Sequence, residues 1–409
     1  MSKHPSPSLP PAEPVEQLPT HVQRLLAGGL GDLNLRELLA LAVSSAAHSE
    51  RSCYLRQHPQ DKANGSYARS VWVGQVPLGV EVPRTREGTF RPFILPPPYQ
   101  RGYQEEHQAL LLGLLASSRS VQAAKAALLR MGVPLCGAHL EQLAEELKNE
   151  LELRNTRPLD PDLLALFLDA KYVEVREGDR LRPTTLYLAI GLQRDGRKRS
   201  LACLALPARE NPDDWKKILS NLLERGLRRV LLVVQDDFPG LLKITQAFFP
   251  QADVQLCLVH LQRNAQAHLP KPLASDFRNR LRTIKTTWQP ESASAQLEQL
   301  SQLVASAAPV FAAELRRKKD HYLAFLKYPE AMRRTFSTTN AVEAVNGQLE
   351  RLRRNNGGYF HSENILKTKL GLAIRQLEEG KWRRVASNAE CSLPQLNALF
   401  HNRFESNGG

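Results

Sequence analysis

The feature that most constrains the fold is the ordered succession of strand-like and helix-like segments that follows Pro158. Three apolar strand-like segments come first: LLALFLDAKYVEVRE, TTLYLAIGLQ and SLACLALP, with a turn at 194–197 before the third. A helix-like segment at about 211–225 follows, and strands and helices then alternate through RVLLVVQD, PGLLKITQAFF, DVQLCLV and HLQRNAQAHL. Three hairpin-linked strands followed by parallel crossovers predict a mixed α/β sheet with helices on its faces.

This β-β-β-α-β-α-β-α order matches the ribonuclease H-like fold. Residues from about 271 to 335 interrupt it with a Gln-, Ala- and Leu-rich sequence, which predicts an all-helical insertion. A helix at 339–354 and a basic helix at about 362–378 come next. We therefore predict one domain over 158–380 and a C-terminal tail over 381–409.

The first 157 residues predict four smaller regions. The Pro-rich residues 1–19 predict a disordered tail, and leucines at helical spacing predict an N-terminal helical region over 20–60. An Asn-Gly turn at 64–65 and alternating valines predict a small β unit over 61–100. Helix, short connection and helix over 101–157 predict a helix-turn-helix-like DNA-binding domain, although any helical hairpin has the same outline.

The charge of the chain favours a polyanionic partner. Its 55 Lys and Arg residues against 42 Asp and Glu residues give a net charge of +13, which makes nucleic acid the leading candidate, with an incidentally basic protein as the alternative. The five cysteines are odd in number and form no CxxC pair, so we expect no disulfide framework. Without a signal peptide or a membrane-length apolar run, we expect a cytoplasmic protein with no membrane partner.

Two aspartates end or interrupt strands of the predicted sheet. Asp169 lies inside an apolar strand, where a charge is costly unless it pairs with Lys171 on the same face or binds a metal. Asp236 ends the strand RVLLVVQ, at the edge where sites collect in α/β sheets, but an Asp there is also a common helix cap. Its neighbour Asp237 competes for either role.

A third acidic residue, Glu343, lies on the helix that follows the insertion. It falls away from the apolar stripe of that helix, and together with Asn340 it also fits a capping box, in which it only binds backbone. In the predicted sheet the first and fourth strands are parallel neighbours, so Asp169 and Asp236 approach each other. Two close carboxylates favour a cation between them, and oxygen ligands suit Mg²⁺, with Mn²⁺ as a substitute. A third carboxylate would complete a site for two metal ions.

The chain resembles the Mutator-type transposases of bacterial insertion sequences from about residue 30 to residue 380. The resemblance rests on several spaced segments: NGSYARSVWVGQVPLGVEVPRTREGTFRP, LFLDAKYVEVRE, YLAIGLQRDGRK, QDDFPGLLKITQAFFPQADVQLCLVHLQRN with a C-x₂-H motif, and TFSTTNAVEAVNGQLERLRR with the TTN-x-x-E-x-x-N signature. The sequence departs from the family pattern at Gln235, where Ser is usual, and at His361, where Pro is usual.

The resemblance implies a DDE transposase whose catalytic, metal-binding residues are Asp169, Asp236 and Glu343. The spacing to Gly240 selects Asp236 over Asp237. In such a mechanism water cuts a phosphodiester at the element's end, and the freed 3′-OH attacks target DNA. The partners implied are double-stranded DNA, both element ends and target, and a second copy of the chain, because two ends must be joined. Such a protein would act on nucleoid DNA.

Further residues are expected to support this site or to contact DNA. The residues that match family motifs and are expected to support the site are Cys257, His260, Asn340 and Asn346. Trp215 also matches a family aromatic residue, and its expected role is either core packing or stacking against a base. The cations expected to contact phosphates are Arg263, Arg351, Arg354 and Arg84. Two alternatives stay open: a domesticated relative that binds DNA without cutting it, and a metal nuclease of the same fold that never joins.

Overall fold

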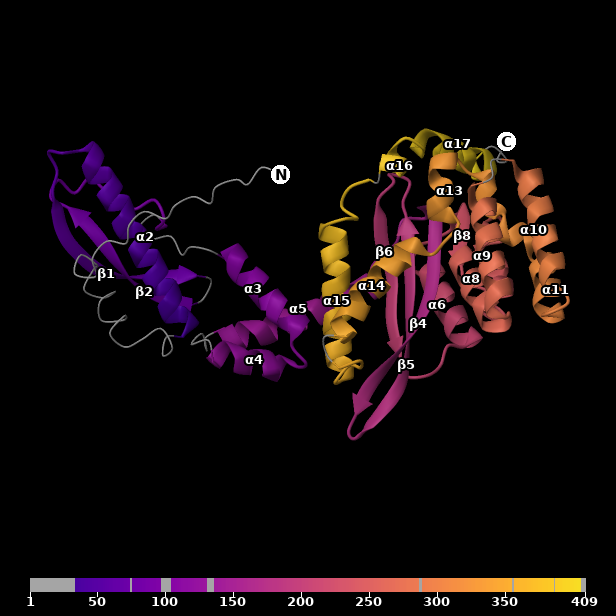
Figure 1. The fold of residues 1–409 in the computed structure, drawn as a ribbon, viewed down its shortest axis with the longest axis horizontal. Coiled ribbons are helices and arrows are strands. Elements are labelled where there is room, and N and C mark those ends of the chain that lie inside the picture. Colours follow the sequence, from indigo (N-terminus) through magenta and orange to yellow (C-terminus); the bar gives the residue numbers. More distant parts are fainter. Residues whose placement is uncertain are drawn as a thin grey trace. The chain divides into compact units, whose positions relative to one another are not determined.

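A computed structural model describes residues 34–73, 76–96, 104–130, 136–286, 289–354, 357–385 and 387–405. The chain divides into two compact units, Met1–Leu143 and Ala144–Gly409 (Figure 1). The expected disordered tail at 1–19 and the connection at 131–135 lie outside the described residues. Among the helices that are described, none combines the length and the apolar composition needed to cross a bilayer.

The N-terminal unit begins with a helix and a hairpin. In the capping box of α2 (Leu35–Gln57), Asn34 Oδ1 accepts a hydrogen bond from the Glu37 amide, and Glu37 Oε2 accepts one from the Asn34 amide. Strands β1 (Ala63–Val73) and β2 (Val76–Thr85) pair antiparallel. The turn expected at 64–65 is wrong: these residues lie within β1, where Gly65 has a φ of 65° beside a register shift.

Three helices follow in the order that the sequence predicts: α3 (Gln104–Ser117), α4 (Val121–Arg130) and α5 (Cys136–Thr156). Ser120 caps α4, because its Oγ accepts a hydrogen bond from the Ala123 amide at 3.0 Å. Lys125 on α4 forms a 2.9 Å ion pair with Glu141 on α5. This ion pair lies within the N-terminal unit, whereas α5 continues past Leu143 into the residues of the C-terminal unit.

The C-terminal unit is built on a five-stranded mixed sheet of order β6-β5-β4-β8-β9. Its strands are β4 (Ala165–Glu177), β5 (Arg180–Leu192), β6 (Lys198–Leu206), β8 (Leu232–Gln235) and β9 (Asp253–Leu256), beside a short parallel pair of β3 (Asp162–Leu163) and β7 (Arg229–Val230). The first three large strands pair antiparallel, and β8 and β9 run parallel to β4. The predicted mixed sheet with its two kinds of connection is confirmed.

One face of this sheet carries the main apolar core. Helices α6 (Pro212–Glu224) and α7 (Leu241–Phe248) contribute residues to it, and so do Leu166, Leu168 and Val233 of the sheet. Since side chains alternate along a strand, Asp169 points to the opposite face of β4. Helix α14 (Asn340–Arg354) lies at that face, and with α15 (Glu363–Glu379) it contacts β4.

The segment predicted as an insertion is helical wherever the structure describes it. After α8 (Leu258–His268) come α9 (Lys271–Thr286), α10 (Pro290–Val304), α11 (Pro309–Arg317), α12 (Lys319–Tyr322), the 3₁₀ helix η3 (Ala324–Lys327) and α13 (Glu330–Phe336). In Figure 1 the helices α9, α10 and α11 stand side by side at the end of the unit beyond β8. The insertion therefore packs beside β9, the edge strand at the parallel end of the sheet, and contacts it through α12 and η3.

The prediction of a C-terminal tail over 381–409 is wrong for the segment from Ser387 to Phe404. The segment folds into α16 (Ser387–Glu390) and α17 (Leu393–Phe404), and the ring of Phe400 is fully buried. The guanidinium groups of Arg194 and Arg229 lie 4.4 and 5.4 Å from that ring. The helix buries Leu396 and Phe400, and the two cations come from the turn after β5 and from β7.

Candidate active site

The strand register brings the two aspartates together. Leu166 of β4 lies opposite Val233 of β8, and Phe167 lies opposite Val234. Extending this register by two residues sets Asp169 beside Asp236, on neighbouring strands that lie about 4.8 Å apart. Both side chains leave the sheet on the face opposite the apolar core, which is the approach that the sequence predicts.

Asp169 is buried, and only one of its carboxylate oxygens has a hydrogen bond. Asn346 on α14 donates from Nδ2 to Asp169 Oδ2 at 2.9 Å, whereas Oδ1 has no hydrogen-bond partner among the described residues. Burial raises the pKa of Asp169 to about 7, the nearby His260 opposes the rise, and the charges of Asp236 and Glu343 add to it. A buried anion with a free oxygen is suited to receive a cation.

Asp236 is not a helix cap. Helix α7 begins at Leu241 and is preceded by Gly240, which gives no side-chain cap, while Asp236 Oδ1 accepts a 3.3 Å hydrogen bond from the Phe238 amide. Burial raises the pKa of Asp236, and the neighbouring His260 acts against this rise. Asp236 is partly buried and shares with Asp169 the neighbouring His260 and a second carboxylate.

Asp237 turns to a different partner. Lys318 Nζ lies 2.8 Å from both of its carboxylate oxygens, and the Tyr322 hydroxyl donates to Oδ2 at 3.1 Å. Both partners come from the helical insertion. Since Asp237 is occupied by this ion pair, the geometry agrees with the choice of Asp236 as the site residue.

Glu343 lies in the first turn of α14 and is near the two aspartates without joining them. Its Oε1 lies 4.0 Å from Arg263 Nη2, and its side chain is 34% exposed. Its charge contributes to the raised pKa of Asp169, which puts it within electrostatic reach. Asn340 is the first residue of this helix, and its side chain lies outside the description, so the expected capping box is not tested.

Helix α14 is fixed against β4 by polar contacts to Asp169 and Lys171, two residues on the same face of that strand. Lys171, which was a possible partner of Asp169, instead forms a 3.1 Å ion pair with Glu350 and donates to the Asn346 carbonyl at 3.3 Å. Asn346 in turn binds Asp169. The helix that carries Glu343 is therefore aligned on Asp169 by residues one and two turns further along.

The C-x₂-H motif lies at the start of α8, which follows β9. Cys257 is buried, with its sulfur 3.7 Å from Thr339 Oγ1. Burial opposes ionisation of Cys257, but His260 outweighs it and lowers the pKa of the thiol. Burial likewise opposes the charged form of His260, while Cys257 and the two aspartates raise its pKa to about 9. His260 Nε2, 3.9 Å from Asp169 Oδ1, thus places a positive charge beside the carboxylates.

A fourth carboxylate, Glu210, was not predicted. It lies just before α6 and accepts a 2.7 Å hydrogen bond from Trp215 Nε1. Burial raises its pKa to about 7, and the charges of Asp236 and Asp169 contribute. Trp215 is fully buried edge-on to Tyr187, so core packing is confirmed over base stacking. No pattern marks Glu210 in the sequence, because it precedes an ordinary helix cap.

The residues fit a divalent metal only in part. Within the described residues, no group of three or more His, Cys, Asp or Glu side chains is close enough to hold a metal ion. The donors on the sheet are nevertheless suitable, because Asp169 Oδ1 is buried without a partner and Asp236 adjoins it. Glu343 would have to leave Arg263 to complete the set.

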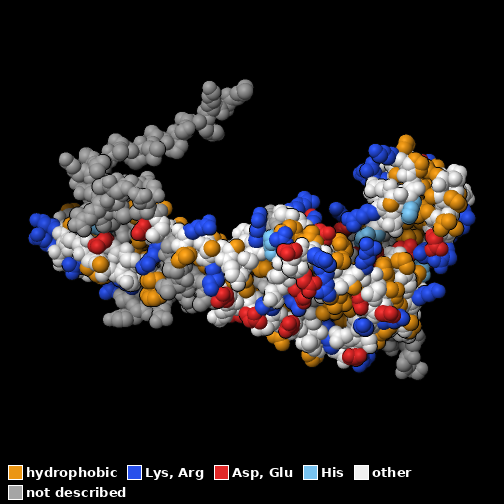
Figure 2. Space-filling model, turned by 90° about the horizontal axis from the view of Figure 1, so that it is seen from below, with side chains coloured by type: hydrophobic (Ala, Val, Ile, Leu, Met, Phe, Trp, Pro, Cys, Tyr) orange, Lys and Arg blue, Asp and Glu red, His pale blue; other side chains and the backbone are white. Residues whose placement is uncertain are grey.

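The expected DNA-contacting arginines fall into two groups. Arg263 and Arg354 are 61% and 76% exposed in the C-terminal unit, and Arg351 is exposed on the same helix as Arg354. Arg84 belongs to the other unit, where its guanidinium group lies 5.6 Å from the Tyr67 ring. Figure 2 shows a hollow in the surface of the C-terminal unit with Lys and Arg side chains gathered around it.

The proteins that this chain is similar to are transposases. The family model for the Mutator family of transposases matches residues 32–384. The transposase for insertion sequence element ISRM3 of Rhizobium meliloti (strain 1021) is 27% identical, over 85% of this chain and 86% of the relative. The transposase for IS406 of Burkholderia multivorans is 30% identical, over 81% and 86% respectively. Among solved structures, the Drosophila P element transposase strand transfer complex matches at 15% identity and a TM-score of 0.26, over 76% of this chain and 88% of that one, and this likeness supports no conclusion about the fold.

Proposed function

Because the chain belongs to the Mutator family of transposases, we propose that it cuts and joins DNA at a site formed by Asp169, Asp236 and Glu343. The observation that carries the proposal is the burial of Asp169 beside Asp236 with one carboxylate oxygen left without a hydrogen bond. His260, 3.9 Å from that oxygen, offsets part of the charge of the two carboxylates, and a metal ion would offset the rest.

The catalytic domain is proposed to be of the ribonuclease H-like type. The strand order, with three antiparallel strands and two parallel ones beside the first, supports this assignment. The three helices of the region 101–157 are proposed to bind the element's ends in the manner of a helix-turn-helix, with the small β unit and Arg84 as an additional contact. The domains proposed are therefore a DNA-reading part and a catalytic part.

Asp169 and Asp236 would hold Mg²⁺ or Mn²⁺, with Glu343 as the third ligand once it turns away from Arg263. Two such ions, when bound, activate the attacking oxygen and stabilise the leaving oxygen of a phosphodiester. Asn346 fixes the orientation of Asp169 through its 2.9 Å hydrogen bond. His260 keeps a positive charge beside the aspartates and limits their repulsion.

The proposed reaction has two steps at one site. In the first, a water oxygen bonds to the phosphorus at the element's end and loses a proton, the bond from phosphorus to the 3′ oxygen breaks, and that oxygen takes up a proton to become a 3′-OH. In the second, the oxygen of this 3′-OH bonds to a target phosphorus and loses its proton, the bond from that phosphorus to the target's 3′ oxygen breaks, and the target's 3′ oxygen takes up a proton. Arg263, Arg351 and Arg354 are proposed to hold phosphates nearby, and two copies of the chain to hold the two ends.

A strand-transfer assay tests this function. The protein is incubated with Mg²⁺, a target plasmid and labelled DNA that carries the chromosomal flanks of its own gene, where the element's ends should lie. We expect cleaved ends with a free 3′-OH and joined products from the wild type, and neither from Glu343→Gln. Wild-type protein that makes no product which Glu343→Gln lacks would contradict the proposal.

The same assay separates the two alternatives. A metal nuclease of this fold gives cleaved ends but no joined product. A DNA-binding relative without activity shifts the labelled end fragments in a gel and cleaves none of them. A supercoiled target and a linear target are compared in parallel, so that joining is not missed for want of a suitable acceptor.

A further inference from the structure

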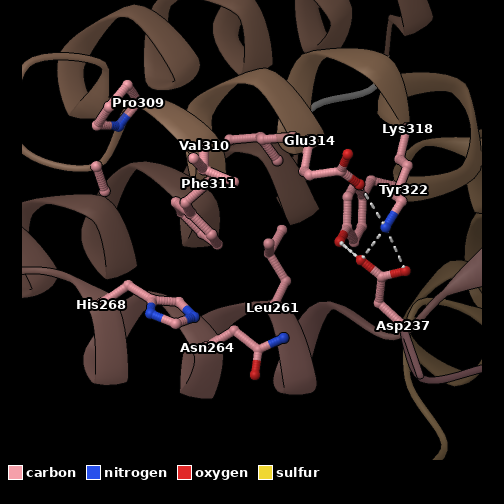
Figure 3. A pocket seen from close by; sticks show the side chains of 12 residues that line it. Asp237, Leu261, Asn264, His268, Pro309, Val310, Phe311, Glu314, Lys318 and Tyr322 are labelled. Atoms are coloured by element: carbon pink, nitrogen blue, oxygen red, sulfur yellow. Dashed lines mark hydrogen bonds and ion pairs between the residues drawn. The ribbon is translucent and has the colours of Figure 1, made fainter. Parts of the chain in front are cut away.

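The residue next to Asp236 ties the site to the helical insertion. Asp237 accepts both of its short contacts from Lys318, at 2.8 Å to each oxygen, and a 3.1 Å hydrogen bond from the Tyr322 hydroxyl (Figure 3). Lys318 joins α11 to α12 and also forms a 2.8 Å ion pair with Glu314. The side chains of Lys318 and Asp237 are only 15% and 18% exposed, so water screens this pair weakly.

This ion pair lies at one end of a groove between α8 and α11. The groove has a volume of about 390 Å³ and is lined mainly by apolar side chains, among them Leu261, Val310 and Phe311 (Figure 3). Along the groove the two helices are separated. At its end, Lys318 and Tyr322 reach across to Asp237, so polar groups make the contact with the loop after β8.

Contacts other than those of Lys318 hold the insertion on β9. Gln255 in β9 donates to the Tyr322 carbonyl at 3.0 Å and accepts from the Phe325 amide at 2.7 Å. Asp253 forms a 2.7 Å ion pair with Lys327 and accepts a 2.9 Å hydrogen bond from the Tyr328 hydroxyl. These contacts hold α12 and η3 on β9, so the insertion is a fixed support from which Lys318 can act on the loop after β8.

The loop runs from Asp236 to Gly240, whose φ of 88° precedes α7. Phe238 packs against the apolar core, its carbonyl accepts a 3.1 Å hydrogen bond from the Leu241 amide, and its amide donates a 3.3 Å hydrogen bond to Asp236 Oδ1. Asp237 is the loop residue that the insertion holds. Asp237 is a second carboxylate directly beside Asp236 in the chain. A cation on Asp237 therefore acts twice on its neighbour: it fixes the backbone and offsets the adjacent charge.

We propose that Lys318 is a positioning residue, which acts through Asp237 to hold Asp236 in place beside Asp169. The inference rests on the proposed function for the role of Asp236, and it assigns part of the helical insertion a place in the site. Residues that orient metal ligands from behind typically change metal affinity or activity 10- to 100-fold when they are replaced.

The test compares Lys318→Met with Arg317→Met, which removes a neighbouring cation that also pairs with Glu314 but does not contact Asp237. Hydrogen exchange is measured in the full-length protein for the peptide that spans 232–248. In Lys318→Met we expect its amides to exchange about 10-fold faster, Mn²⁺ to bind about 10-fold more weakly by electron paramagnetic resonance, and cleavage to slow by about 10- to 100-fold. Arg317→Met should match the wild type in exchange and Mn²⁺ affinity.

Two further variants show whether Lys318 acts through Asp237. The double variant Lys318→Met with Asp237→Asn also removes the charge that Lys318→Met leaves uncompensated. If Lys318 acts through Asp237, the double variant should lose no more Mn²⁺ affinity or cleavage rate than Lys318→Met alone. If the two residues act independently, their losses should add. Tyr322→Phe removes one hydroxyl and serves if Lys318→Met does not fold; it should accelerate exchange in the same peptide to a smaller extent.

Each outcome decides the inference separately from the proposed function. Wild-type exchange and Mn²⁺ affinity in Lys318→Met, equal effects of Arg317→Met, or additive losses in the double variant would overturn it. Hydrogen exchange at the wild-type rate in Tyr322→Phe would also overturn the inference. If Asp236→Asn leaves cleavage intact, the proposed function fails, while the exchange result still decides whether Lys318 positions the loop.

Discussion

The two halves of the site differ in how far the fold alone prepares them. Asp169 is buried on β4, Asp236 is partly buried directly after β8, and the sheet register sets the two side by side. Glu343 comes from a helix after the insertion, is 34% exposed, and faces Arg263 at 4.0 Å. The strand half is therefore preformed at a cost in stability, whereas the helix half is near its place and is free to move.

The difference teaches which element sets which property. A buried pair of carboxylates is destabilising without a cation, so the sheet half should control metal binding and stability. A partly exposed carboxylate costs little, so the helix half should control whether bound metal is used on DNA. Variants in the two halves should therefore lose activity to a similar extent but differ in stability and in metal binding.

The largest effect is expected on catalysis, and it is shared by both halves. Asp169→Asn, Asp236→Asn and Glu343→Gln should each lower the rate of end cleavage by about 1000-fold or more, because a lost metal ligand removes several kcal/mol of transition-state stabilisation. The rate is measured on labelled end fragments in Mg²⁺. Cleavage by Glu343→Gln within about 10-fold of the wild type would remove the helix half from the site.

The next effect is on stability, and it should separate the halves. In metal-free buffer the pKa of Asp169 is about 7 when folded, against about 3.9 when unfolded. Between these values the folded state binds more protons, so wild-type stability falls as pH rises from about 4 to 7. At pH 8, Asp169→Asn should then be more stable by up to about 4 kcal/mol, measured by denaturant unfolding.

Glu343→Gln serves as the matched control in that experiment. Its exposed ion pair is worth about 1 kcal/mol or less, so the variant should follow the wild-type curve closely at every pH. A wild-type stability that does not fall between pH 4 and 7, or an Asp169→Asn variant that is less stable at pH 8, would show that the strand carboxylates are not a strained pair.

Metal binding gives a somewhat smaller effect with the same asymmetry. At a Mg²⁺ concentration 100 times its dissociation constant, the wild type should gain about 2.7 kcal/mol of stability, which a chelator reverses. Glu343→Gln should keep part of this gain, because the strand pair remains, and Asp169→Asn should lose it. The measurement is thermal unfolding with and without Mg²⁺, and equal gains in all three proteins would place the metal elsewhere.

The smallest effect is expected at Arg263, where the helix half meets solvent. Arg263→Gln should change stability by less than about 1 kcal/mol, because its pair with Glu343 is long and exposed. If it contacts a phosphate, the slope of log affinity for DNA against log salt should fall by about 1. Fluorescence anisotropy at several salt concentrations measures this, and an unchanged slope argues against a phosphate contact.

How much the sequence predicts follows the same division between the halves. The strands were predictable because apolar runs broken by turn residues define them, and the approach of Asp169 to Asp236 follows from their order. The preference for Asp236 over Asp237 came from the family resemblance, and a partner 81 residues away in sequence, Lys318, gives it a physical reason. Such pairings leave no local pattern.

Other features were missed for reasons that are specific to each residue. Glu210 precedes a helix cap and is linked to the site only by the charges of Asp236 and Asp169, which contribute to its raised pKa. Helix α17 was missed although LPQLNALFHNRF has apolar residues at helical spacing and a Pro in its first turn, which are helix signals in the sequence. The 64–65 turn was wrong because Gly65 serves a bulge inside β1, a use of a positive φ that the dipeptide alone does not distinguish.

The most direct test of the account is the position of Mn²⁺ in crystals of the protein bound to an end fragment, located by anomalous scattering. We expect peaks bridging the carboxylates of Asp169 and Asp236, at distances near the 2.0–2.1 Å typical of Mg²⁺, with Glu343 turned from Arg263 to join them. Mn²⁺ bound away from Asp169 and Asp236, or Glu343 still paired with Arg263 while the metals are bound, would contradict a single site made of all three.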